Sequence, residues 1–158
     1  MRFFLIAAAV LSGASLLPAV PRQETRAELP VASAEAWNSI ALERDASGHY
    51  RVEASVNGLP VDFLVDTGAS QVVLSPADAA RLGFRADRLR FSARASTANG
   101  TVALAPVSLR ELRIGQLSRR GVDAVVNGAE MPFSLLGMSF LASLEGWEAR
   151  GDRLMLYW

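Results

Sequence analysis

Phe63-Leu-Val-Asp-Thr-Gly-Ala-Ser70 places an acidic residue directly after an apolar run and two positions before a glycine. A charged side chain at the end of a buried strand costs free energy unless it is paired or has a function. Gly68 allows the backbone to turn sharply and to approach another chain or a ligand closely. Thr67 carries a hydroxyl that can form a hydrogen bond across a two-fold contact. An ordinary turn between strands is the alternative, but the stretch has the parts needed to hold the Asp66 carboxylate at the floor of a cleft.

The residues on both sides of this stretch are typical of short β-strands joined by tight turns. Residues 49–56 alternate between apolar and polar side chains, and Asn57-Gly58 is a pair preferred in hairpin turns. Further strands are expected over 61–65, 71–74, 89–95, 101–105, 107–112, 122–126, 133–136, 147–150 and 154–158. This pattern predicts an all-β domain that is closed on itself or by a partner.

One or two short helices interrupt the strands. Ser75-Pro76 is suited to the N-cap and first position of a helix, which we expect over residues 75–82. Residues 138–144 are long enough for one or two further helical turns. A second Asn-Gly pair, Asn99-Gly100, predicts the tip of another hairpin.

The composition of the chain excludes several kinds of chemistry. Its 158 residues are 51% apolar and 20% charged, which favours one globular domain with a core. The absence of cysteine excludes a thiol nucleophile, a disulfide and a Cys-ligated metal site. The single histidine, His49, excludes a multi-histidine metal site, and the formal net charge of zero gives no reason to expect nucleic acid as a partner. The remaining hydrolytic chemistries depend mainly on carboxylates, and we expect no metal and no cofactor.

The N-terminal residues 1–21 are interpreted as a signal peptide or a membrane anchor. Residues 3–20 are apolar and uncharged and follow Arg2, as in a secretory signal, and they are about as long as a minimal membrane helix. Pro18 favours the cleaved signal slightly, because it breaks a helix near the point where a span would finish. Either interpretation predicts an exported protein, periplasmic or anchored in the membrane and facing the periplasm. Residues 22–38 are expected to be a linker and residues 39–158 the folded domain.

The motifs also resemble those of a known family. Phe63-Leu-Val-Asp-Thr-Gly-Ala-Ser70 resembles the active-site motif of the aspartic proteases, and the single-domain length is similar to their retropepsin-like branch. Leu135-Leu136-Gly137 resembles the hydrophobic-hydrophobic-Gly element that lies behind the active-site loop of that fold. Residues 95–100 fall where the family has its substrate-covering flap, and residues 134–141 are similar to exported, membrane-associated bacterial members. The resemblance spans residues 36–158.

This resemblance implies a retropepsin-like closed β-barrel protomer with one or two short helices that is active as a two-fold dimer. It also implies a peptide or protein substrate and the following roles. The catalytic residues are Asp66, Thr67 and Gly68; the substrate-binding residues are Ala69, Ser70, Ala98, Asn99 and Gly100; and the structural support comes from Leu135, Leu136 and Gly137.

The chemistry of this family requires two carboxylates, one ionised to accept a proton from water and one protonated to polarise the scissile carbonyl. The chain contains one Asp-Thr-Gly and no Asp-Ser-Gly. The second carboxylate is therefore expected from Asp66 of another copy across a two-fold axis, so that a monomer is inactive. The apolar strand expected over residues 154–158 is a candidate for the dimer edge.

Two other functions compete with an aspartic endopeptidase. A retropepsin-like module could grip peptides or act as a scaffold without cleaving, although such a module has no need for an acid at Asp66. A carboxylate-based glycosidase would require two distinct acids in one chain. Viral members of the family commonly have an acid where this chain has Ser70 and a basic residue where it has Met138. Because both are absent here, we expect apolar packing in place of that ion pair and do not transfer viral substrate preferences.

Overall fold

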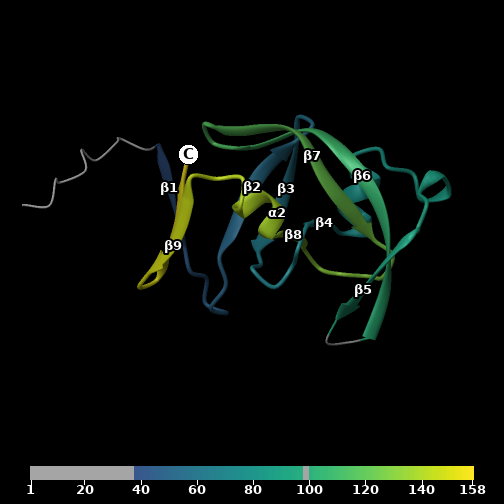
Figure 1. Ribbon diagram of the computed structural model, residues 1–158, viewed down its shortest axis with the longest axis horizontal. Helices are drawn as coiled ribbons and strands as arrows, with labels where there is room; N and C mark the ends of the chain where they lie inside the picture. The colour runs from purple at the N-terminus through teal and green to yellow at the C-terminus, as the bar shows by residue number, and fades with distance from the viewer. Residues whose placement is uncertain (1–37, 98–99) are drawn as a thin grey trace, which may run out of the picture. The chain divides into compact units, whose positions relative to one another are not determined.

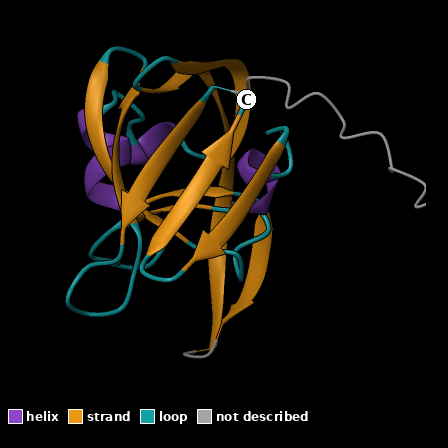
Figure 2. Cartoon of the chain, turned by 90° about the vertical axis from the view of Figure 1, so that its left-hand side faces the viewer, coloured by secondary structure: helices purple, strands orange, loops and turns teal. Residues whose placement is uncertain are grey.

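The computed structural model describes residues 38–97 and 100–158, in which strands predominate (Figure 1, Figure 2). The predicted signal or anchor and nearly all of the predicted linker lie outside these residues, as do Ala98 and Asn99. No helix within the described ranges is long and apolar enough to cross a membrane. The elements are β1 (Ser39–Glu43), β2 (Arg51–Val56), β3 (Leu59–Val65), β4 (Val72–Leu74), α1 (Pro76–Arg81), the 3₁₀ helix η1 (Ala86–Arg88), β5 (Ala93–Thr97), β6 (Gly100–Ile114), β7 (Leu117–Asn127), β8 (Ser134–Leu136), α2 (Met138–Leu141), β9 (Gly146–Arg150) and β10 (Arg153–Tyr157).

Six strands form a closed barrel, in the order β2-β3-β8-β4-β7-β6. The barrel closes where β6 returns to β2, with Val56 opposite Leu112. β5 pairs with the beginning of β6, on the side of that strand that faces away from β7. Alternate residues of β2 and β3 point into the core, where burial stabilises each large apolar side chain by about 1.5–3 kcal/mol. The largest fully buried side chains include Val56, Val61, Phe63, Leu74, Leu109, Leu112, Leu136 and Phe140. The predicted all-β closed barrel is thus confirmed.

A turn formed by Asn57 and Gly58 joins β2 to β3, as the Asn-Gly pair predicts. Both residues have positive φ, 53° and 93°, the conformation required by a tight two-residue hairpin turn. The Asn57 side-chain carbonyl also accepts hydrogen bonds from the backbone N–H groups of Arg110 and Glu111, at 2.8 and 3.2 Å. The turn therefore connects the hairpin to β6, next to the point where the barrel closes.

β6 and β7 are longer than the sequence pattern indicates. β6 is one strand of 15 residues and runs through Pro106, where we expected two strands. Only β7 pairs with β6 at Pro106, so an imino acid is tolerated because one side of the strand is unpaired. β7 likewise continues through Gly121, whose φ of 63° bends the strand without ending it. Figure 1 shows β6 and β7 side by side.

A three-stranded sheet, in the order β1-β10-β9, completes the domain. The prediction that residues 154–158 form an exposed edge is wrong, because β10 pairs along its whole length with β1 on one side and with β9 on the other. The sequence pattern missed this arrangement because β1 is nearly the whole chain away from β10. The edges of this sheet are β1 and β9.

Candidate active site

Asp66 lies at the end of β3, in a turn that is held by backbone hydrogen bonds. β3 runs parallel to β8, and the Asp66 N–H donates to the carbonyl of Leu136 at 3.1 Å. The Ala69 N–H closes the turn by donating to the Asp66 carbonyl at 3.2 Å. The Gly68 N–H donates to Oδ1 of the Asp66 side chain at 2.8 Å. The chain therefore fixes both the backbone and the carboxylate of Asp66.

The other side of the turn is attached to the segment that follows β8. The Met138 N–H donates to the Ala69 carbonyl at 2.8 Å, and the Ser139 N–H donates to the Ser70 carbonyl at 3.0 Å. Gly137 lies so close to the turn that a Cβ there would be 2.2 Å from the carbonyl oxygen of Gln71 and 2.6 Å from that of Ala69. Only a glycine fits this contact without moving the backbone.

A cavity of about 680 Å³ opens in front of Asp66. Five strands and two loops contribute its lining: Asp66, Gly68, Ala69, Ser70, Gln71, Val73, Ala95, Ser96, Thr97, Val102, Leu104, Val125, Asn127, Ala129, Glu130, Met131, Pro132 and Leu135. Asp66 is half-buried at this surface. Most of the walls are apolar, which suits an extended chain with apolar side chains near the carboxylate.

The cavity brings together only some of the residues predicted from the sequence. Asp66, Gly68, Ala69, Ser70 and Leu135 line it. Thr67 is exposed and does not line it, and Gly100 pairs with Thr97 as the first residue of β6. Ala98 and Asn99 of the predicted flap lie outside the described residues.

Sequence reasoning missed most of the walls of the cavity. Val73 is on β4 and Val125 on β7, two strands that run parallel to each other. The wall that contains Glu130 is the loop between β7 and β8. Leu135-Leu136-Gly137, which follows this loop, could have predicted its position. That element was expected to lie behind the Asp66 turn, so the loop just before it must lie close to the same turn. Among the described residues, no group of three or more His, Cys, Asp or Glu side chains could hold a metal ion.

Residues 52–143 match the family described as gag-polyprotein putative aspartyl protease. The chain belongs to this family. The family match includes the Asp66 turn, the walls of the cavity and the segment that follows β8.

Solved structures of retropepsin-like proteases agree with this family membership. A retropepsin-like aspartic protease from Rickettsia conorii is 34% identical and aligns with a TM-score of 0.70 over 77% of this chain and 95% of that one. EIAV protease complexed with the inhibitor HBY-793 is 21% identical, with a TM-score of 0.55 over 67% of this chain and 97% of that one, and shows the shared fold. The chain is therefore a retropepsin-like protease homologue.

Curated relatives extend beyond the matched region. An uncharacterized protein in the cobV 5′ region of Sinorhizobium sp. is 39% identical over 127 residues, which are 80% of this chain and 54% of that protein. An uncharacterized protein of Rickettsia prowazekii (strain Madrid E) is 36% identical over 117 residues, which are 74% of this chain and 50% of that protein. The chain spans about half the length of the curated relatives it matches.

This family member lacks the ion pair that the viral enzymes commonly place beside the active-site turn. Met138 is half-buried and packs against the core, while Ser70 is exposed at the cavity. The two segments are joined by their backbones, through the Ser139 N–H and the Ser70 carbonyl. Apolar packing of Met138, as expected, and a backbone hydrogen bond take the place of charged side chains.

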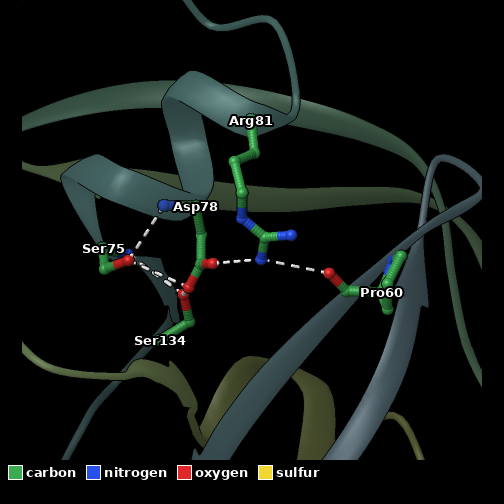
Figure 3. Close-up of polar contacts among 5 residues, drawn as sticks. All are labelled: Pro60, Ser75, Asp78, Arg81 and Ser134. Carbon is green, nitrogen blue, oxygen red and sulfur yellow. Dashed lines mark hydrogen bonds and ion pairs between the residues drawn. The ribbon is translucent and has the colours of Figure 1, made fainter.

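A polar network holds α1 against β8 in this protease homologue (Figure 3). Ser75 is the N-cap of α1, as predicted, and its Oγ accepts from the Asp78 N–H at 3.1 Å. The hydroxyls of Ser75 and Ser134 both donate to Asp78 Oδ2, at 2.9 and 2.6 Å. Arg81 bridges Asp78 Oδ1 and the carbonyl of Pro60. The network therefore connects α1 with both β8 and the start of β3.

The charge of Asp78 is stabilised within this network. Burial acts to raise the pKa of Asp78, but hydrogen bonds from Ser134, Arg81 and Ser75 outweigh it and lower the pKa below its ordinary value. The side chain of Asp78 is only 15% exposed. The ionised form of Asp78 thus contributes to the stability of the folded state.

Replacement of Asp78 by Asn is expected to lower the free energy of unfolding by about 2 kcal/mol at pH 7, because it removes charge-assisted hydrogen bonds from a buried site. Since the folded-state pKa of Asp78 is lowered, its contribution is complete above about pH 4 and is lost as the pH falls through the folded-state value. The difference between wild type and Asp78→Asn should therefore shrink with acidification, as measured by urea unfolding.

The matched control for this substitution is Asp87→Asn. Asp87 pairs with Arg85 at 3.0 Å, but the two side chains are 61% and 63% exposed. An exposed pair contributes little, so the control should change stability by less than about 1 kcal/mol. Equal effects of the two substitutions at pH 7 would show that the Asp78 network does not stabilise the fold.

Proposed function

We propose that the protein is an aspartic endopeptidase, in which a pair of Asp66 carboxylates, one from each protomer of a homodimer, activates a water molecule. The observation that carries this proposal is the Asp66 carboxylate, held by the Gly68 N–H at the floor of a largely apolar cavity. Membership of the aspartyl protease family supports the same chemistry. The substrate is an extended peptide or an unfolded protein.

In the proposed reaction, a water molecule lies between the two Asp66 carboxylates and the scissile carbonyl. The ionised carboxylate accepts a proton from the water, whose oxygen attacks the carbonyl carbon. The protonated carboxylate donates its proton to the carbonyl oxygen, which forms a neutral tetrahedral diol. Transfer of a proton to the amide nitrogen and cleavage of the C–N bond then release an amine and a carboxylic acid. Two carboxylates this close share one proton, so the pair supplies both the acid and the base.

The requirement for a homodimer follows from the number of carboxylates at the cavity. Within the described part of the chain, Asp66 and Glu130 are the acidic residues that line it, and only Asp66 belongs to an Asp-Thr-Gly turn. A two-fold axis beside Asp66 would bring two identical turns together and would close the cavity from the other side.

Digestion of an unfolded protein over a wide range of enzyme concentrations tests this function. The rate per chain should rise in proportion to concentration while the protein is mostly monomeric, and it should become constant once the dimer predominates. Size measurement at the same concentrations should show the change from monomer to dimer. A rate per chain that does not depend on concentration, from protein that stays monomeric, would rule out the shared site. Absence of cleavage at every pH, with peptides still bound, would favour the peptide-binding module.

A further inference from the structure

Glu130 lies on the wall of the cavity, on the loop over residues 128–133 that joins β7 to β8. It is exposed, and among the described residues its carboxylate has no hydrogen-bond or ion-pair partner. Six other acidic side chains do form ion pairs with arginine. A charge that faces a substrate cavity without a partner is available to bind a charge on the substrate.

No basic side chain among the described lining residues is available to pair with the Glu130 carboxylate. The described lining contains no arginine, and its remaining ionisable side chain is Asp66. The neighbours of Glu130 on the loop are Ala129, Met131 and Pro132, which carry no charge. The wall therefore presents one negative group in apolar surroundings, where a cationic side chain can rest its aliphatic part on the wall and reach the carboxylate with its head.

The loop that carries Glu130 is held in place at its start. The Asn127 side chain contacts the Ala129 N–H at 3.4 Å and Met131 Sδ at 3.1 Å, and the Gly128 N–H donates to the Ala103 carbonyl at 2.9 Å. A Cβ at Gly128 would lie 2.9 Å from the Ala103 carbonyl oxygen and 3.2 Å from the Phe91 ring. These contacts hold residues on both sides of Glu130 before a substrate binds, so less conformational entropy of the loop is lost on binding.

We propose that Glu130 is a specificity-determining residue that selects peptides carrying arginine or lysine at a fixed position near the scissile bond. This inference rests on the proposed endopeptidase function and names the class of its substrates. The rest of the cavity accepts apolar side chains, so the preferred substrate combines apolar residues at the cleavage site with a basic residue beside them. Successive side chains of an extended peptide point to opposite faces. The preference is therefore expected at one substrate position, or at positions two residues apart that face the same wall.

A scan of one arginine through an otherwise neutral, apolar-centred peptide tests the proposal, with glutamine at the same position as reference. The wild type should show kcat/KM about fivefold higher for arginine than for glutamine at the responsive position, as for a solvent-accessible ion pair. This ratio should fall toward one as salt is raised from about 0.05 M to about 0.5 M. Glu130→Gln should bring the ratio to about one, and Glu130→Arg should reverse it in favour of a glutamate peptide.

Glu53→Gln is the matched control, because Glu53 is exposed on β2 and does not line the cavity. This variant should keep the arginine preference of the wild type. Binding of the same peptides to Asp66→Asn, measured by fluorescence anisotropy, should show the same fivefold preference without any cleavage. The binding assay therefore tests the role of Glu130 even if the proposed catalysis fails.

Three outcomes would overturn the proposal. Arginine and glutamine peptides could be cleaved and bound equally at every position, or the preference could persist in Glu130→Gln. Complete loss of cleavage of every peptide in Glu130→Gln, with the fold retained, would instead make Glu130 the second carboxylate of the reaction. A different result would separate the two proposals. If the wild type cleaves no peptide but arginine peptides still bind more tightly than glutamine peptides, the proposed endopeptidase function fails and the role of Glu130 in peptide selection stands.

Discussion

Replacement of Asp66 by Asn is expected to abolish peptide hydrolysis, with a fall in kcat/KM of roughly 1,000-fold or more. An amide cannot accept a proton from the water, and general base catalysis is lost at both halves of a symmetric site. The fold should persist, because the side-chain carbonyl of the introduced asparagine can still accept the Gly68 N–H, and the backbone bonds from Asp66 to Leu136 and from Ala69 to Asp66 are unchanged. Digestion of an unfolded protein, with circular dichroism of both proteins, measures the two effects.

Mixing the two proteins separates a shared site from an independent one. If each active site needs two Asp66 residues, an excess of Asp66→Asn should lower the activity of a fixed amount of wild type, because mixed dimers hold one carboxylate. Wild-type activity that is unchanged by the excess would contradict a site shared between protomers. Equal cleavage by wild type and Asp66→Asn would contradict the catalytic role of Asp66 altogether.

Replacement of Gly137 by Ala is expected to lower the free energy of unfolding by about 3 kcal/mol or more and to remove activity. The added Cβ would lie 2.2 Å from the Gln71 carbonyl oxygen and 2.6 Å from that of Ala69. Both are backbone atoms, so relief of the clash must move the turn and weaken the bond from the Met138 N–H to the Ala69 carbonyl. Urea unfolding and the peptide assay, carried out on the same preparation, measure stability and activity.

Gly146→Ala is the control for this substitution. A Cβ at Gly146 would meet Tyr157 Cδ2 at 3.8 Å, which is an ordinary van der Waals contact in strand β9. Its stability should therefore differ from the wild type by less than about 1 kcal/mol. A Gly137→Ala protein as stable and active as the control would show that the turn can move away from β8 without cost.

The parts of this protein that sequence reasoning could predict are those encoded locally. Asn57-Gly58 specifies its hairpin through the backbone freedom of two residues, and the Ser75 side chain caps α1 by accepting from the backbone N–H of Asp78, three positions away. The Asp66 turn could be recognised for the same reason, because its atoms interact within a few residues. These elements were correct within one or two residues at their ends.

The parts that could not be predicted depend on pairing between distant strands. β4 runs parallel to β7 and β3 runs parallel to β8, and no local pattern specifies which strands become neighbours. The walls of the cavity, including Glu130, follow from these pairings and were therefore missed. The same reason explains the wrong edge assignment for β10, since its partner β1 begins at Ser39.

The pairing of β3 with β8 also bears on protein synthesis, because the ribosome makes the Asp66 turn well before it makes Leu136, Gly137 and Met138. An unfinished chain lacks the carbonyl that accepts the Asp66 N–H and the N–H that holds Ala69. The turn then lacks the backbone bonds that attach it to β8 and to the segment after β8, and only the local bond from the Gly68 N–H remains on its carboxylate. The full set of bonds that holds the Asp66 turn therefore forms only after residues 134–139 have been synthesised and have folded against it.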